Sequence, residues 1–121
     1  MKTLLLLWKA FDYSLQGVRN TFFDEIAYHI EFSVAVILIP AALQLPVSLI
    51  VRIFLIVSAL LVLIIELINT AVGVAVNRIS TEQNTLSVKV KDAVSAAVLM
   101  ASINFVLVWG IVLFNLIFNI S

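Results

Sequence analysis

The sequence contains no cysteine, a single histidine and few charged residues. The absence of cysteine excludes disulfides and thiol chemistry, although it does not identify a compartment. One histidine, His29, cannot form a histidine cluster for zinc or haem. The chain also lacks a P-loop, a glycine-rich loop and the spacing of a known metal-binding motif. Seven basic and seven acidic residues give a net charge of zero, so charge indicates no nucleic-acid partner.

Apolar residues are what the sequence has in excess. They make up 64% of its 121 residues, and the mean hydropathy is +1.22. A soluble domain of this length cannot bury so much apolar surface in one core, so we expect an integral membrane protein. Three stretches are long enough to span a bilayer, which takes about 20 apolar residues: 27–43, 48–76 and 88–120. Pro40 either kinks the first span or marks its last turns, and Pro46 and Ser48 suit the start of the second.

Residues 3–25 have a different pattern, with apolar side chains at intervals of three and four and polar side chains between them. This periodicity predicts an amphipathic helix that lies in the membrane interface, and a plain membrane anchor is the alternative. The first residues imitate a signal peptide, but Lys9 interrupts their short apolar core and no cleavage site follows, so we expect them in the mature protein. The predicted fold is therefore an all-α membrane protein, a single domain over 1–121 with three transmembrane helices and one surface helix.

The basic residues predict the orientation in the membrane. Three crossings place six of them on one side: Lys2, Lys9, Arg19, Arg78, Lys89 and Lys91. Arg52 alone lies near the other side. Because positive charge favours the cytoplasm, the N-terminus and the 80–87 loop should be cytoplasmic and the C-terminus outside.

Glu66 stands in the middle of the second predicted span, where an acid costs at least ~2.5–3.5 kcal/mol. At ~100° per residue, four further residues lie within about 60° of it around the helix: Asn69, Thr70, Gly73 and Asn77. This polar stripe must face protein or water rather than lipid. Polar contacts between helices are the structural explanation, but such contacts rarely need a carboxyl group, so Glu66 is a candidate functional residue.

Further acids and bases gather at the predicted cytoplasmic boundary: Asp24, Glu25, Glu31, Glu82, Lys89, Lys91 and Asp92. Carboxylates that face lysines across a wet interface could bind a divalent cation with a polyphosphate, or they could be ordinary solvated helix ends. Asn104 and Asn115 in the third span are typical of hydrogen bonds between helices. Three helices cannot easily cover the polar stripe alone, so we expect an oligomer.

Five segments resemble the small integral-membrane diacylglycerol kinases of bacteria and the related undecaprenol kinases: "KAFDYSLQGVR" (9–19), "DEIAYHIE" (24–31), "ELINTA" (66–71), "NRIS" (77–80) and "VKDAVSAAVL" (90–99). The resemblance covers nearly the whole chain. It implies a homotrimer in the bacterial inner membrane. It also implies transfer of the γ-phosphate of MgATP to a lipid hydroxyl, of diacylglycerol or a polyprenol, at the cytoplasmic face.

The resemblance also implies roles for individual residues. Glu66 matches the catalytic base, Asn69 its neighbour in the active site, and Glu25 a carboxylate that holds Mg²⁺. The positions that match ATP contacts are Tyr13, Glu82, Lys91 and Asp92. The positions that match the lipid site are Glu31, Arg52 and Ser95.

Three positions depart from the family pattern. Gly73 stands where the family has a second metal-binding glutamate, Asn77 replaces an aspartate, and Leu6 replaces an arginine that touches substrate. Two further hypotheses therefore stand beside a lipid kinase. One is a member without activity that serves as a trimeric lipid-binding or assembly protein. The other is an oligomer that conducts ions or protons through Glu66, although the outer half of its helix is apolar.

Overall fold

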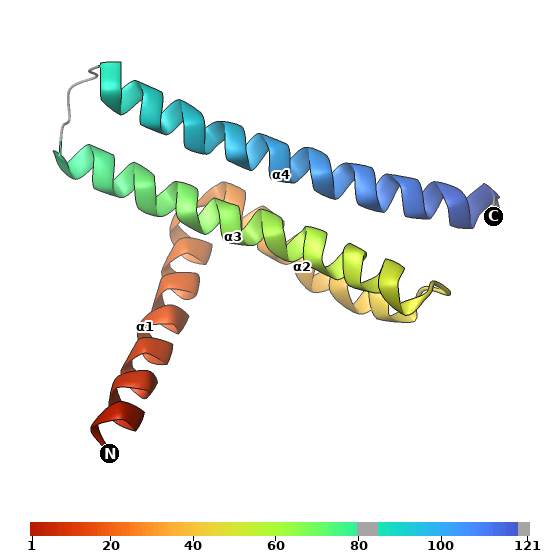
Figure 1. Ribbon diagram of the computed structural model, residues 1–121, viewed down its shortest axis with the longest axis horizontal. Coiled ribbons are helices and arrows are strands. Elements are labelled where there is room, and N and C mark those ends of the chain that lie inside the picture. Colours follow the sequence, from red (N-terminus) through yellow and green to blue (C-terminus); the bar gives the residue numbers. More distant parts are fainter. Residues whose placement is uncertain (80–84, 119–121) are drawn as a thin grey trace.

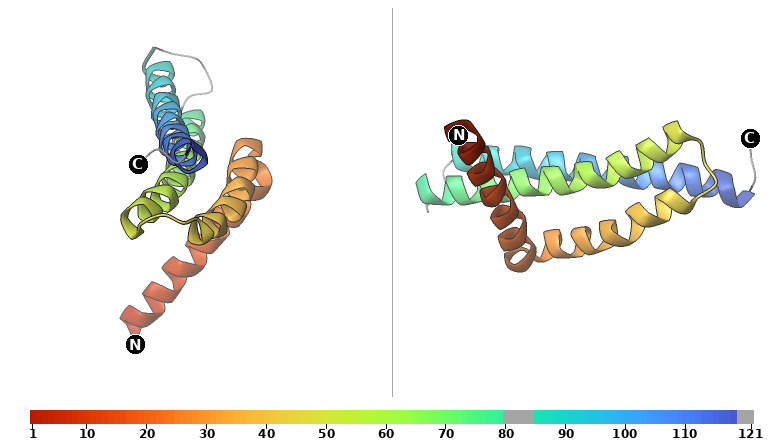
Figure 2. Two further views of the ribbon diagram at one scale, coloured as in Figure 1. Left: turned by 90° about the vertical axis from the view of Figure 1, so that its right-hand side faces the viewer. Right: turned by 90° about the horizontal axis from the view of Figure 1, so that it is seen from below.

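The computed structural model describes residues 1–79 and 85–118, and the described chain forms four α-helices. They are α1 (Lys2–Asp24), α2 (Ile26–Gln44), α3 (Leu49–Ile79) and α4 (Thr85–Phe118). The last three are long and apolar enough to cross a membrane. They lie alongside one another, whereas α1 runs across them and away from the bundle (Figures 1 and 2). The predicted fold class, with three spans and one further amphipathic helix, is confirmed.

The α3 helix is the centre of the bundle. It packs against α4, against α2 and against the end of α1. In the described part of the chain, α2 and α4 lie on either side of α3, and their backbones do not come close to each other. The buried face of α3 follows helical spacing, with intervals of three and one: Leu55, Ser58, Ala59, Val62, Leu63 and Glu66. The face that holds the bundle together therefore ends on the carboxyl group of Glu66.

The half of the bundle near the α2–α3 turn contains a close contact between α3 and α4. Ala42, Leu55 and Trp109 form a buried cluster there. The indole Nε1 of Trp109 donates a hydrogen bond of 3.0 Å to the carbonyl oxygen of Leu55, as a buried indole N–H requires. This bond fixes the depth of α4 relative to α3.

Two short connections set the directions of the helices. The backbone of Glu25 is extended (φ −113°, ψ 116°), and this one residue separates α1 from α2. At the other end of α2, the helix continues through Pro40 to Gln44, and the hydroxyl of Ser48 accepts a hydrogen bond from the Val51 N–H in the first turn of α3. Pro40 thus marks the last turns of the first span.

The helices differ in detail from the predicted ranges. The α3 helix continues to Ile79, past the predicted limit at 76, and α4 already begins at Thr85 instead of 88. Backbone hydrogen bonding extends a helix beyond the apolar segment that periodicity detects, so such limits are set too short. The predicted end of the last span at 120 lies outside the described residues.

Candidate functional site

Glu66 is positioned by the packing face of α3. It is only 7% exposed, because the helix turns this residue toward α2 together with the apolar residues that precede it. The carboxyl group of Glu31 on α2 reaches within hydrogen-bonding distance of the Glu66 carboxyl, and Glu25 is close enough for electrostatic interaction with it. Among the described residues, the Oε2 atom of Glu31 is buried without a hydrogen-bond partner. Three acids thus converge where the start of α2 meets the middle of α3.

A polar cavity of about 310 Å³ lies on the side of α3 toward α4 and the α1–α2 corner. Its polar lining residues are Glu25, Asn69, Thr70, Asn77, Lys91 and Ser95. All four residues of the predicted polar stripe, Gly73 included, line this cavity. Glu66 is not part of the lining and lies one helical turn deeper than Thr70. The cavity therefore brings oxygen ligands and one ammonium group to the C-terminal part of α3, which also carries Glu66.

One hydrogen bond joins the two helices across this cavity. The Nζ of Lys91 on α4 donates to the Oδ1 of Asn77 on α3 at 2.6 Å. Gly73 lies one turn before Asn77, and a Cβ atom built on it would meet no other atom within 4 Å. The wall of the cavity at Gly73 therefore has space for the first carbon of a side chain.

The cavity residues suit a hard cation only in part. Carboxylate and amide oxygens such as those of Glu25 and Asn69 are ligands that Mg²⁺ accepts together with water and phosphate oxygens. Within residues 1–79 and 85–118, however, no three Asp, Glu, His or Cys side chains lie close enough to hold a metal by themselves. The donor set therefore fits Mg²⁺ that keeps phosphate and water ligands, and does not fit a cation enclosed by protein.

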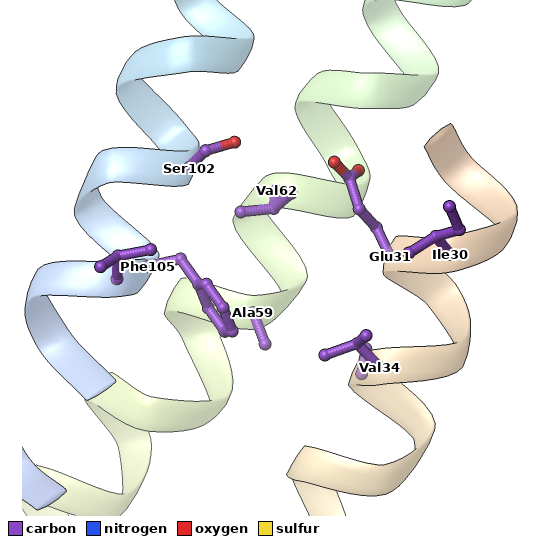
Figure 3. Close-up of a pocket in the computed structure, with 9 residues that line it drawn as sticks. Ile30, Glu31, Val34, Ala59, Val62, Ser102 and Phe105 are labelled. Atoms are coloured by element: carbon purple, nitrogen blue, oxygen red, sulfur yellow. The ribbon is translucent and has the colours of Figure 1, made fainter. Parts of the chain in front are cut away.

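A second cavity is apolar and lies between α2, α3 and α4, in the groove between the separated backbones of α2 and α4 (Figure 3). Its volume is about 210 Å³. Ile30 and Val34 on α2, Ala59 and Val62 on α3, and Ser102, Phe105 and Val106 on α4 contribute to the lining. Glu31 also lines this cavity, and its carboxyl group points toward α3 (Figure 3). Glu31 therefore links the apolar groove with the carboxyl group of Glu66.

The other predicted site residues lie apart from these two cavities. Tyr13 is 67% exposed on α1, and Asp92 is exposed on α4. Arg52 lies at the opposite end of the bundle from the polar cavity, where its guanidinium donates to the carbonyl oxygens of Ala42, Leu45 and Val47 at 3.1, 2.9 and 3.3 Å. Glu82 lies outside the described residues. The structure thus brings together Glu25, Asn69, Lys91 and Ser95, with Glu31 and Glu66 next to them, and leaves Tyr13, Asp92 and Arg52 elsewhere.

Sequence reasoning gave no role to Ser102 and Phe105, which line the apolar cavity. Ser102 belongs to a group of small residues in the last span, with Ser95, Ala96, Ala97 and Ala101, and such a group is typical of close helix packing rather than of a cavity. Nothing in the local sequence marks Phe105 as different from the many other apolar residues of α4.

Comparison with known proteins places the chain in a family. Residues 12–113 match the model of the prokaryotic diacylglycerol kinases. The diacylglycerol kinase of Haemophilus influenzae is 44% identical over 102 residues, which cover 84% of this chain and 86% of that protein. The diacylglycerol kinase of Escherichia coli K12 is 39% identical over 107 residues, 88% of each chain, and that of Helicobacter pylori J99 is 34% identical over 113 residues, 93% of this chain and 88% of that protein. By its matched length, its helices and its similarity to these relatives, this chain belongs to the prokaryotic diacylglycerol kinase family.

Proposed function

We propose that this protein transfers the γ-phosphate of ATP to the hydroxyl group of a membrane lipid alcohol, with diacylglycerol as the substrate and a polyprenol as the alternative. One observation carries the proposal. Along α3, the buried Glu66 lies between Ala59 and Val62, which line an apolar cavity, and Asn69 and Thr70, which line a polar cavity. A lipid alcohol needs the first environment for its chains, and a polyphosphate needs the second.

In the proposed reaction, Glu66 is the general base. It accepts the proton of the lipid hydroxyl while the hydroxyl oxygen forms a bond to the γ-phosphorus and the bond to the β–γ bridging oxygen breaks. The products are the lipid phosphate and ADP. Asn69 lies one turn from Glu66 and lines the polar cavity, so it can orient the reacting groups. Because the transfer itself needs little covalent chemistry from the protein, most of the rate depends on this positioning.

The two ends of the polar cavity have different tasks in this proposal. Lys91 supplies positive charge for the phosphates, and Glu25 with Asn69 supplies oxygen ligands for Mg²⁺. When bound, Mg²⁺ neutralises the negative charge of the phosphate oxygens. Tyr13, Glu82 and Asp92 remain proposed ATP contacts, and Arg52 and Ser95 remain proposed lipid contacts, by resemblance to the family.

The apolar cavity supports the lipid side of the proposal. We infer that it receives part of an acyl chain, because its lining is mostly apolar and the Glu31 carboxyl group points toward α3 (Figure 3), where it lies beside Glu66. A lipid held in this way would have its hydroxyl group close to Glu66 and its chains in the bilayer.

We also infer a homotrimer in the bacterial inner membrane, with the N-terminus and the 80–87 loop in the cytoplasm and the C-terminus outside. The start of α4 and the end of α3 lie at one end of the bundle, and the α2–α3 turn lies at the other (Figure 1). This arrangement gathers the basic residues at one end, except Arg52. Asn104 supports the assembly, because its side chain is exposed in the middle of an apolar span and a polar group there favours a partner helix over lipid.

A phosphate-transfer assay tests the proposed function. Purified protein in micelles receives labelled ATP and Mg²⁺, with diacylglycerol and a polyprenol offered side by side, and the labelled lipid phosphate is measured. We expect transfer to diacylglycerol. Transfer to the polyprenol alone would identify the polyprenol as the substrate instead of diacylglycerol. No transfer to either lipid, with the oligomer intact, would favour the hypothesis that the protein is a family member without kinase activity. The observation behind that hypothesis is Gly73, which stands where the family has a metal-binding glutamate.

A further inference from the structure

Asn77 has no role in the reaction described above, yet its side chain accepts a hydrogen bond across the polar cavity. It lies in the last turns of α3, and its partner Lys91 lies in the second turn of α4. The bond measures 2.6 Å and its donor is a charged ammonium group, which makes it stronger than a hydrogen bond between two neutral groups. Both residues line the cavity in which we place the phosphates.

The chemistry of this pair bears on how Lys91 can bind an anion. A lysine side chain has four rotatable bonds and loses much conformational freedom when a ligand fixes it. A hydrogen bond to Asn77 fixes the ammonium group before the ligand arrives. The ammonium has three N–H donors, so donation to one amide oxygen leaves two for phosphate oxygens. The amide is neutral, so it holds the lysine in place without cancelling its charge.

We propose that Asn77 is a positioning residue for the polyphosphate: it acts through Lys91 by holding the ammonium group in the cavity, and so increases the affinity for ATP. The inference rests on the proposed function in naming ATP as the ligand. It assigns no contact between Asn77 and the nucleotide. Its effect must therefore depend on the presence of Lys91.

Asn77→Leu tests this inference, because leucine has a similar size and cannot accept the hydrogen bond. We expect the KM for ATP to rise about three- to tenfold, the factor that corresponds to ordering one long side chain during binding instead of beforehand. The KM for the lipid and the melting temperature should stay close to those of the parent. Asn77→Asp keeps an acceptor for Lys91, and its KM for ATP should lie nearer the parent's than the leucine variant's. Asn77→Ala is the second variant if leucine disturbs the fold.

A double-mutant cycle separates positioning from a general structural effect. In a Lys91→Met background, Asn77→Leu should change the affinity for a fluorescent ATP analogue by less than twofold, because no ammonium group remains to be held. The matched control is Asn115→Leu, the same substitution at a position near the end of α4 and far from Lys91 at its start. This variant should leave nucleotide affinity unchanged. The inference would be overturned if Asn77→Leu lowered the affinity for the analogue fully in the Lys91→Met background. It would also be overturned if Asn77→Leu did not change this affinity when Lys91 is present.

Direct binding of the analogue also separates this inference from the proposed reaction. If the parent binds nucleotide in an Asn77-dependent way and phosphorylates no lipid, the reaction is wrong and the positioning stands. If the parent phosphorylates lipid with an ATP KM that Asn77→Leu does not change, the reaction stands and the positioning is wrong. If the parent binds no nucleotide at all, both are wrong.

Discussion

At the scale of single residues, Glu66 occupies a position that helix packing would otherwise give to an apolar side chain. It continues the buried face of α3 one turn beyond Val62 and Leu63. Burial of an acid costs free energy unless it has partners, and the acids Glu31 and Glu25 lie near this one. Helix–helix packing gains nothing from such a group, and we therefore propose that Glu66 takes part in phosphate transfer.

Replacing this acid by its amide tests the assignment. Glu66→Gln keeps the size and hydrogen bonding of the side chain but cannot accept the hydroxyl proton, so kcat should fall by about 10²–10⁴-fold, the usual contribution of a general base. Expression and oligomeric state should be unchanged. The control is Asp12→Asn on the exposed face of α1, where kcat should stay within about twofold, as for ordinary surface substitutions. Near-normal turnover by Glu66→Gln would refute its role as the base.

Gly73 gives the second prediction at this scale. The structure leaves room for a side chain there, on the wall of the polar cavity. In Gly73→Glu, the new carboxylate would add a ligand for Mg²⁺, and glutamate also favours a helix over glycine by roughly 0.6–1 kcal/mol. We expect the variant to need less Mg²⁺ for half-maximal activity, measured by phosphate transfer over a magnesium titration at saturating ATP and lipid. The control is Gly73→Gln, which adds a side chain of the same size without the charge. Gly110→Glu would be a poor control, because that glycine lies within an apolar span. A slower Gly73→Glu enzyme beside a parent that is already fully active at low magnesium would show that the metal has other ligands.

Individual contacts were the part of the site that sequence could not predict. Helical spacing alone placed Asn69, Thr70, Gly73 and Asn77 on one face, and the cavity lies on that face. The pairing of Asn77 with Lys91 depends on the register between α3 and α4, which packing determines and a single sequence does not contain. The same holds for the approach of Glu31 to Glu66, since it depends on how α2 crosses α3.

At the scale of helices, the turn between α2 and α3 is held by Arg52. The last carbonyl groups of a helix have no partners within the helix, and a cation near them is favourable. The guanidinium satisfies one carbonyl of α2 and two of the turn, those of Ala42, Leu45 and Val47. This contact fixes α2 relative to α3 at their turn, and the approach of Glu31 to Glu66 at the other end of the two helices depends on that packing.

Arg52→Met should therefore destabilise the protein by about 2 kcal/mol, the range for hydrogen bonds from a charged donor. The melting temperature in micelles measures the effect. Arg19→Met on the exposed face of α1 is the matched control and should change it little. The KM for the lipid is measured in the same variants. A higher lipid KM for Arg52→Met with unchanged stability would favour a lipid contact at Arg52 over a structural role.

Helix type and number were the features that sequence predicted well, and the reason is physical. Long apolar runs can satisfy their backbone groups in a bilayer only as helices. The period of three and four in residues 3–25 is likewise a property of the local chain, and it indicated α1 as a separate amphipathic helix. The single extended residue at Glu25 was not predictable to the residue, because no proline or glycine marks the corner.

At the scale of the whole molecule, the orientation in the membrane determines whether the site meets ATP. A reporter fused after Ser121 should be found outside the cytoplasm, and one inserted at Gln83 should be found inside, because the basic residues gather near the second position. Paired reporters that are active on opposite sides of the membrane measure this. The reverse result would place the polar cavity away from cytoplasmic ATP and would rule out the proposed reaction in the cell.

The buried face of α3 has a consequence for how such a chain changes over many generations. The residues that hold the bundle and the carboxyl group assigned to the reaction share one stripe. Replacement of a buried acid by an apolar side chain of similar volume is often neutral or stabilising. A lineage that no longer needed phosphate transfer would gain stability by drifting to leucine at position 66, and most such drift passes without harm. If Glu66 is the base as we propose, an acid at this position marks selection for the reaction, and its loss in a relative would be the first sign that the fold had been kept for another purpose.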